Sequence, residues 1–89
     1  MSKKVERLVR RMGIPEDVIL KTPILELQAF RCIHILNYHG ILELTGERIR
    51  ISTTMGDYII DGKNLRIDLA NSSEMVVEGT FSSLTFCKK

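Results

Sequence analysis

The sequence predicts a mainly β protein, a curved antiparallel meander of short strands preceded by a short N-terminal amphipathic helix. Apolar and polar residues alternate between Ile49 and Leu69 with a period of two, which places successive side chains of a strand on opposite faces. Glycine-bearing turns separate these alternating runs. Short strands that are apolar on one face must curl to close a core, so we expect a roll or a partly open barrel.

A β-solenoid is the alternative fold, because its rungs would also be short strands. The glycines of the β region lie at positions 40, 46, 56, 62 and 79, which is too irregular for a fixed structural repeat. This spacing favours the meander.

Length and composition indicate one small domain. The chain has 89 residues and a formal net charge of +2, so neither disorder nor a dominant nucleic-acid field is indicated. Its two cysteines, Cys32 and Cys87, lie too far apart for a CxxC metal motif and favour a reducing compartment. The start lacks a secretory signal and the sequence contains no apolar stretch of the roughly 20 residues that cross a bilayer, so we expect a cytoplasmic protein.

Residues 1–23 are predicted to form a basic amphipathic helix and a linker. Val5, Leu8, Val9 and Met12 recur at helical spacing, and Thr22-Pro23 ends the region with extended backbone. The helix either contacts an anionic membrane surface with its basic side or packs its apolar side on the sheet. The basic residues are Lys3, Lys4, Arg7, Arg10 and Arg11.

Residues 24–87 are predicted to form the β domain, with about seven or eight short strands. An interruption at Phe30-Arg31 indicates a turn or bulge, and further turns are expected at 37–40, 45–47, 54–57 and 61–64, with a loop at 71–73. The predicted turn residues are Gly40, Gly56, Gly62, Asn64 and Gly79. The predicted core residues are Ile49, Ile51, Leu65, Ile67 and Val77, and Leu69 is expected on the same buried face.

An ordered series of short motifs resembles the YabP/YqfC family of sporulation proteins. The motifs are Asn37-x-x-Gly40-Ile41-Leu42, Ile49-x-Ile51-x-Thr53-x-x-Gly56, Ile60-x-Gly62-x-Asn64-Leu65-x-Ile67 and Val77-Glu78-Gly79-x-Phe81. The segment 14–18 with Pro23 is similar to the YqfC branch in particular, so the likeness covers about residues 14–86. The chain departs from the family pattern at Ala29, Tyr38 and His39, which argues against a ligand role for the turn at 37–40.

The resemblance implies a small non-enzymatic protein of endospore formation without a cofactor. It implies action in the mother cell, in the cytoplasm or peripherally at the forespore outer membrane, as a structural or assembly factor at the developing spore surface. For the YqfC branch the implied partner is the membrane protein YqfD. A membrane-surface adaptor that binds through the basic helix is the alternative function.

The residues offer little for catalysis, metal binding or nucleic-acid binding. Cys32 and His34 share a strand face and His39 follows five residues later, but an ordinary thiol and two ordinary imidazoles are favoured over a zinc site. No group is placed to orient a histidine beside Cys32. Aromatic residues do not interleave with the basic ones, which argues against nucleic acid.

The edge of the predicted sheet has the strongest claim to function. An open sheet of short strands exposes unpaired backbone donors and acceptors, and an assembly protein can add strands there from a partner or from copies of itself. We therefore expect a protein partner and self-association through sheet edges.

Overall fold

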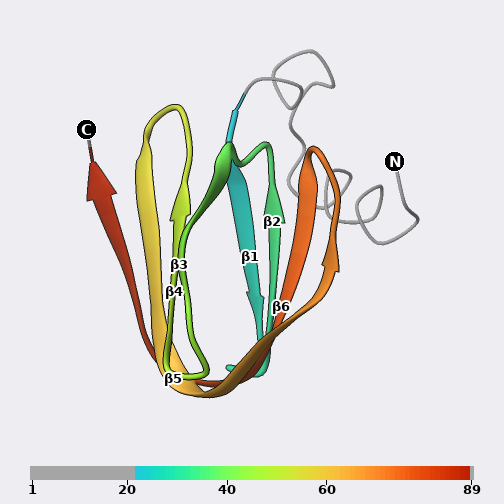
Figure 1. Ribbon diagram of the computed structural model, residues 1–89, viewed down its shortest axis with the longest axis vertical. Helices are drawn as coiled ribbons and strands as arrows, with labels where there is room; N and C mark the ends of the chain where they lie inside the picture. The colour runs from blue at the N-terminus through green and yellow to red at the C-terminus, as the bar shows by residue number, and fades with distance from the viewer. Residues whose placement is uncertain (1–21, 89) are drawn as a thin grey trace.

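The computed structural model describes residues 22–88, which form six antiparallel strands and no helix (Figure 1). In the single sheet the strands lie in the order β1-β2-β6-β5-β4-β3. This confirms the predicted mainly β, antiparallel fold and excludes the solenoid, whose stacked rungs would be parallel. The strands are β1 (Ile24–Gln28), β2 (Cys32–Leu36), β3 (Gly40–Leu44), β4 (Arg48–Ser52), β5 (Gly56–Ala70) and β6 (Glu74–Lys88).

The long hairpin of β5 and β6 bends sharply near its middle and folds the sheet back on itself (Figure 1). On one side of the bend β4 pairs with residues 57–61 of β5, and on the other side β2 pairs with residues 74–78 of β6. The sheet therefore has two arms. The β3–β4 arm also contains residues 56–61 and 83–88, and the β1–β2 arm also contains residues 66–70 and 74–78.

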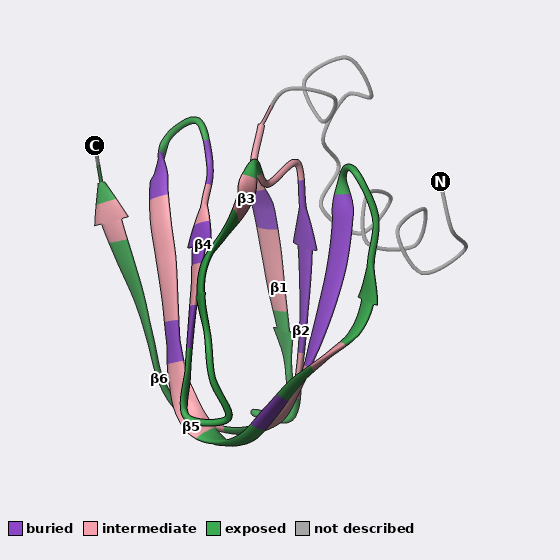
Figure 2. Cartoon of the chain, in the orientation of Figure 1, coloured by how far each residue is buried: buried purple, intermediate pink, exposed green. Residues whose placement is uncertain are grey.

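The hydrophobic core joins the two arms, because its cluster takes buried residues from β2, β4, β5 and β6 (Figure 2). Alternation along β2 and β4 turns Ile33, Ile35, Ile49 and Ile51 inward, and all four are fully buried. The remaining members of the cluster are Ile60, Leu65, Met75 and Val77. The two arms thus close the core that a flat sheet of this size would leave open.

Most of the predicted core is found, with one error. Ile49, Ile51, Leu65 and Val77 are buried, and Ile67 packs against the cluster. Leu69, predicted on the same face, is 42% exposed. A register shift after Ile67 pairs Leu69 with Val76. Val77 faces the core, so its neighbour Val76 faces outward, and Leu69 lies on the outer face with it.

Two glycines allow the backbones of β5 and β6 to approach at the bend. A Cβ atom on Gly62 would collide with the carbonyl oxygen of Thr80 and lie 3.0 Å from the Cα atom of Phe81. Gly79 has a φ of 148°, and a Cβ atom there would lie 2.9 Å from the carbonyl oxygen of Asn64. Glycine inside a strand marks such close contacts and bulges.

The predicted turns at Gly62, Asn64 and Gly79 are therefore wrong. Gly62 and Asn64 lie inside β5, and Gly79 lies inside β6. The ladder shifts register between Asp61 and Gly62 and again after Lys63, so these residues bend two continuous strands without reversing the chain. For this reason six strands replace the expected seven or eight.

The other glycines of the prediction are the first residues of strands. Gly56 begins β5 after the turn that follows β4, and Gly40 begins β3. The segment before Gly40 crosses from β2 to the opposite end of the sheet, and Asn37 has a φ of 61° there. The turn expected at 37–40 is thus part of a crossover between the arms.

The predicted helix and its basic residues lie outside residues 22–88. No helix in the described part is long and apolar enough to span a membrane.

Candidate interaction site

The residues considered for metal binding are not brought together. Cys32 and His34 lie on β2, and His39 lies in the crossover before β3. His34 is buried on the face of β2 opposite to the core residues Ile33 and Ile35. Within residues 22–88 no three His, Cys, Asp or Glu side chains are grouped so that they could hold a metal ion.

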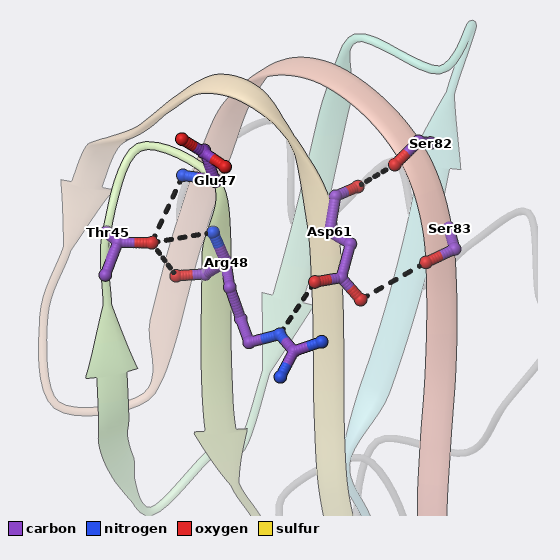
Figure 3. A network of polar contacts seen from close by, with 6 residues as sticks. All are labelled: Thr45, Glu47, Arg48, Asp61, Ser82 and Ser83. Atoms are coloured by element: carbon purple, nitrogen blue, oxygen red, sulfur yellow. Dashed lines mark hydrogen bonds and ion pairs between the residues drawn. The ribbon is translucent and has the colours of Figure 1, made fainter.

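A polar network ties three strands together on the outer face of the β3–β4 arm (Figure 3). Arg48 Nε donates a hydrogen bond to Asp61 Oδ1 at 2.7 Å, and Ser83 Oγ donates to Asp61 Oδ2 at 3.3 Å. Thr45 Oγ1 accepts hydrogen bonds from the backbone N–H groups of Glu47 and Arg48 and holds the β3–β4 turn. The network therefore fixes β4 against β5 and β6 at one end of the arm.

The charges of this network stabilise each other. The hydrogen bond from Arg48 lowers the pKa of Asp61, and the same bond raises the pKa of Arg48. Arg50 makes a similar forked pair with Asp57, at 3.0 and 2.9 Å, and Arg66 bonds Glu78 at 3.1 Å. Exposed ion pairs of this kind add little stability. They are cross-strand ties.

A hollow of about 580 Å³ lies at the bend of the hairpin. Arg66 in its wall is paired with Glu78, and no histidine is among the residues that line it. The lining residues are Arg31, Cys32, Asn64, Arg66, Glu78, Gly79 and Thr80.

Among the described strands, the C-terminal half of β6 has a neighbour on one side only. Residues 83–88 pair with β5 without a register shift, whereas β2 pairs with residues 74–78 alone. This half lies at the outer margin of the folded sheet, next to the C-terminus, and most of it is exposed (Figures 1 and 2). We call residues Ser83–Lys88 the free β6 edge.

The hydrogen-bond pattern shows which backbone groups point outward there. Thr53 N–H donates to the Gly56 carbonyl oxygen and Gly62 N–H donates to the Glu47 carbonyl oxygen, and both pairs continue the β4–β5 register. Antiparallel pairs alternate between hydrogen-bonded and non-hydrogen-bonded, so Tyr58 and Ile60 direct their backbone groups to β4. Asp57, Ile59 and Asp61 direct theirs to β6.

The same alternation then continues on β6. Ser83, Thr85 and Cys87 are the partners of Asp61, Ile59 and Asp57, so they bond β5. The N–H and C=O groups of Leu84 and Phe86 consequently point away from β5, toward the free side of the strand.

Apolar side chains accompany these open backbone groups. Leu84 is 39% and Phe86 46% exposed, although both lie on the inner face of the arm beside Ile60 and Tyr58. The rings of Phe86 and Tyr58 lie 5.2 Å apart between centroids, which orients the exposed phenyl ring. The free β6 edge thus offers both hydrogen-bonding groups and apolar surface to a further strand.

Sequence reasoning predicted exposed sheet edges but did not identify this one. The alternation of Ser83, Leu84, Thr85, Phe86 and Cys87 signals a regular strand. The outer side of this strand is not covered by another described strand because the hairpin of β5 and β6 bends. The sequence predicted turns at Gly62 and Gly79 in place of this bend.

Comparison with known proteins assigns the family. The sequence profile of the YabP family matches residues 21–89. The chain is 30% identical over 79 residues to the uncharacterized protein YqfC of Bacillus subtilis (strain 168), and the match covers 89% of this chain and 85% of that protein. No solved structure was found to match the chain. The chain belongs to the YabP family, which agrees with the resemblance found in its motifs.

Proposed function

We propose that this chain is a sporulation-related, non-enzymatic protein that acts as a structural or assembly factor in endospore formation. In this proposal it works in the mother cell at the developing spore surface, and it joins an assembly by pairing a strand edge with another polypeptide. Family membership supports the setting, since the resemblance to the YabP/YqfC family implies a role in endospore formation.

The free β6 edge is the observation that carries the proposed mechanism. Leu84 and Phe86 combine outward backbone groups with half-exposed apolar side chains on a stretch of β6 that pairs without a register shift. Strand addition uses both features, because main-chain hydrogen bonds supply affinity and alternate side chains supply specificity. An edge that only faces solvent is usually protected by charged residues, proline or a bulge, and not lined with apolar side chains.

A membrane protein at the forespore provides the site of action in this proposal. The resemblance to the YqfC branch implies YqfD as that partner, and peripheral binding to it would hold a cytoplasmic protein at the forespore outer membrane. Pull-down of the chain from sporulating cells tests this part separately, and recovery of the chain without YqfD would contradict it.

Replacing the gene by one that encodes Leu84→Lys tests the proposed function. A lysine on the inner side of an edge strand opposes strand addition, so we expect loss of localisation at the developing spore and a lower spore yield. The matched control is Met55→Lys, because Met55 is 53% exposed in the turn before β5 and lies on no strand edge. Normal localisation and sporulation of Leu84→Lys at wild-type protein levels would contradict the proposal.

The non-enzymatic part has its own test in Cys32→Ser combined with His39→Gln. These substitutions remove a thiol and an imidazole without touching the core, so we expect unchanged sporulation. A sporulation defect with normal protein levels would instead point to chemistry at Cys32 or His39.

A further inference from the structure

We propose that the free β6 edge binds the same edge of a second copy of this chain, antiparallel, about a two-fold axis at Thr85. This inference rests on the edge-mediated assembly proposed above and names the occupant of the edge and its register. The two sheets would then join into one, and the pair would be closed because each copy uses the same strand.

The backbone of the edge satisfies this pairing. Leu84 and Phe86 direct their N–H and C=O groups outward, so they must form the hydrogen-bonded pairs of a new ladder. With the axis at Thr85, Leu84 of each copy meets Phe86 of the other. Thr85 meets the second copy's Thr85 as a non-hydrogen-bonded pair, which agrees with its own backbone groups being used by β5.

The side chains match in the same register. On the inner face, two pairs of Leu84 with Phe86 would bring together apolar surface that is 39% and 46% exposed in one copy. On the other face, Thr85 would oppose Thr85, and Ser83 would oppose Cys87. Threonine pairs are favourable across antiparallel strands, and the Leu84–Phe86 pairs would remove apolar surface from water.

Charge also favours a second copy in this register. Lys88 is the one charged residue of the free β6 edge, and it would oppose Ser82 of the second copy. A shift of the axis by one residue, to Phe86, would place Lys88 opposite Leu84. Of these two registers, the one centred on Thr85 keeps the ammonium group away from the apolar pair. A shift of the axis to Leu84 would place Phe86 opposite Ser82 and lose the Leu84–Phe86 pairs.

The other edges of the sheet are less suited to strand addition. β3 has an irregularity between Ile41 and Glu43, and a bulge on an edge strand hinders further pairing. Residues 66–70 of β5 contain a register shift and the charged residues Arg66 and Asp68. β1 carries the charged Glu26. Of these described edges, the free β6 edge alone is regular and nearly uncharged over six residues.

Disulfide trapping of Thr85→Cys in a Cys87→Ser background tests the register. Opposed Cα atoms of a non-hydrogen-bonded pair lie about 4.5 Å apart, which is within the range of disulfides. We expect a covalent dimer on mild oxidation that reductant reverses. The control is Cys87→Ser alone, which retains Cys32 and should form no covalent dimer under the same conditions.

Sedimentation of the wild-type protein and of Leu84→Pro tests whether a second copy of the chain binds the free β6 edge. Proline at position 84 removes an outward N–H and leaves the β5 bonds intact, so the variant should keep its far-ultraviolet spectrum and remain at 10.2 kDa. The wild-type protein should reach twice that mass as its concentration rises, and it should stop there.

The outcomes separate this inference from the proposed function. Three results would overturn pairing at the free β6 edge in this register. The wild-type protein could stay monomeric at all concentrations, it could form species larger than the dimer, or the Thr85→Cys variant could fail to cross-link. If Leu84→Lys still fails in sporulating cells in that case, the edge binds a different protein and the proposed function stands. If Leu84→Lys also sporulates normally, both are wrong.

Discussion

At the scale of single residues, the bend of the hairpin depends on positions where a side chain has no room. Gly62 and Gly79 face each other's strands at distances that exclude a Cβ atom, and Gly79 has a backbone conformation that other residues avoid. The same residue type serves elsewhere in the chain with open space around it, as at Gly46. Glycine therefore has two different roles in this sequence. Gly62 and Gly79 allow the close approach of strands that forms the bend, whereas Gly46 does not.

Gly79→Ala should lower the free energy of unfolding by about 1–3 kcal/mol, the usual cost of a strained backbone conformation at a non-glycine residue. Its Cβ atom would lie 2.9 Å from a carbonyl oxygen and 3.0 Å from the Cα atom of Leu65. Urea denaturation provides the measurement. Gly46→Ala is the control, with an expected change within about 0.5 kcal/mol. Equal effects of the two substitutions would contradict the role given to Gly79.

Asp61 makes stability depend on pH in acid. Its pKa is lowered from 3.8 by the hydrogen bond from Arg48, so the folded state holds its proton less tightly than the unfolded chain. The stabilisation is present above the unfolded pKa and is lost as the pH falls through the folded pKa. The urea midpoint of the wild-type protein should therefore fall more steeply below about pH 4 than that of Asp61→Asn. Because the pair is exposed, the difference should be small and should shrink in salt.

An equally steep fall in Asp61→Asn would show that Arg48 and Asp61 do not contribute in this way. Asp68→Asn controls for loss of a carboxylate outside the network of Figure 3.

At the scale of strands, the alternation of residue types predicted where strands lie but not where two of them are continuous. The runs around Ile49 and Leu84 were identified correctly because their period of two is local information. The continuity of β5 through Gly62 depends on Thr80, eighteen residues further along, and no local pattern contains that contact. For the same reason the sequence predicted edges in general, while the bend decides that the free one is residues 83–88.

Proline substitutions should distinguish the two sides of β6. Leu84→Pro removes a backbone N–H that points away from β5, whereas Thr85→Pro removes one that bonds β5. We expect Thr85→Pro to lower the thermal midpoint much more than Leu84→Pro, since proline is tolerated at edges but not inside a ladder. Circular dichroism melts provide the comparison at a concentration where both proteins are monomeric. The reverse order would mean that Leu84, and not Thr85, bonds β5.

At the scale of the molecule, one bent hairpin converts a six-stranded sheet into two arms with a core between them. The core is small, because its cluster within residues 22–88 consists of eight buried residues. A domain of this size has little stability to spare, so pairing of its exposed edge would add stability as well as build an assembly. Function and stability are thus linked through the same apolar residues at the margin of the core.

Ile51→Ala should cost about 2–4 kcal/mol in free energy of unfolding, because a fully buried side chain leaves a cavity. Leu42→Ala is the control, since Leu42 is 59% exposed on β3 and should change stability by less than about 1 kcal/mol. Chemical denaturation measures both. Similar losses for the two substitutions would contradict a core that lies between the arms.

Amide hydrogen exchange along residues 83–87 over a dilution series can show whether this half of β6 is bonded on one side and open on the other. We expect the Thr85 amide to be protected at every concentration, and the amides of Leu84 and Phe86 to be protected in concentrated protein and to lose that protection on dilution. Equal protection of Leu84 and Thr85 at the highest dilution would contradict the free β6 edge and, with it, the proposed mode of assembly.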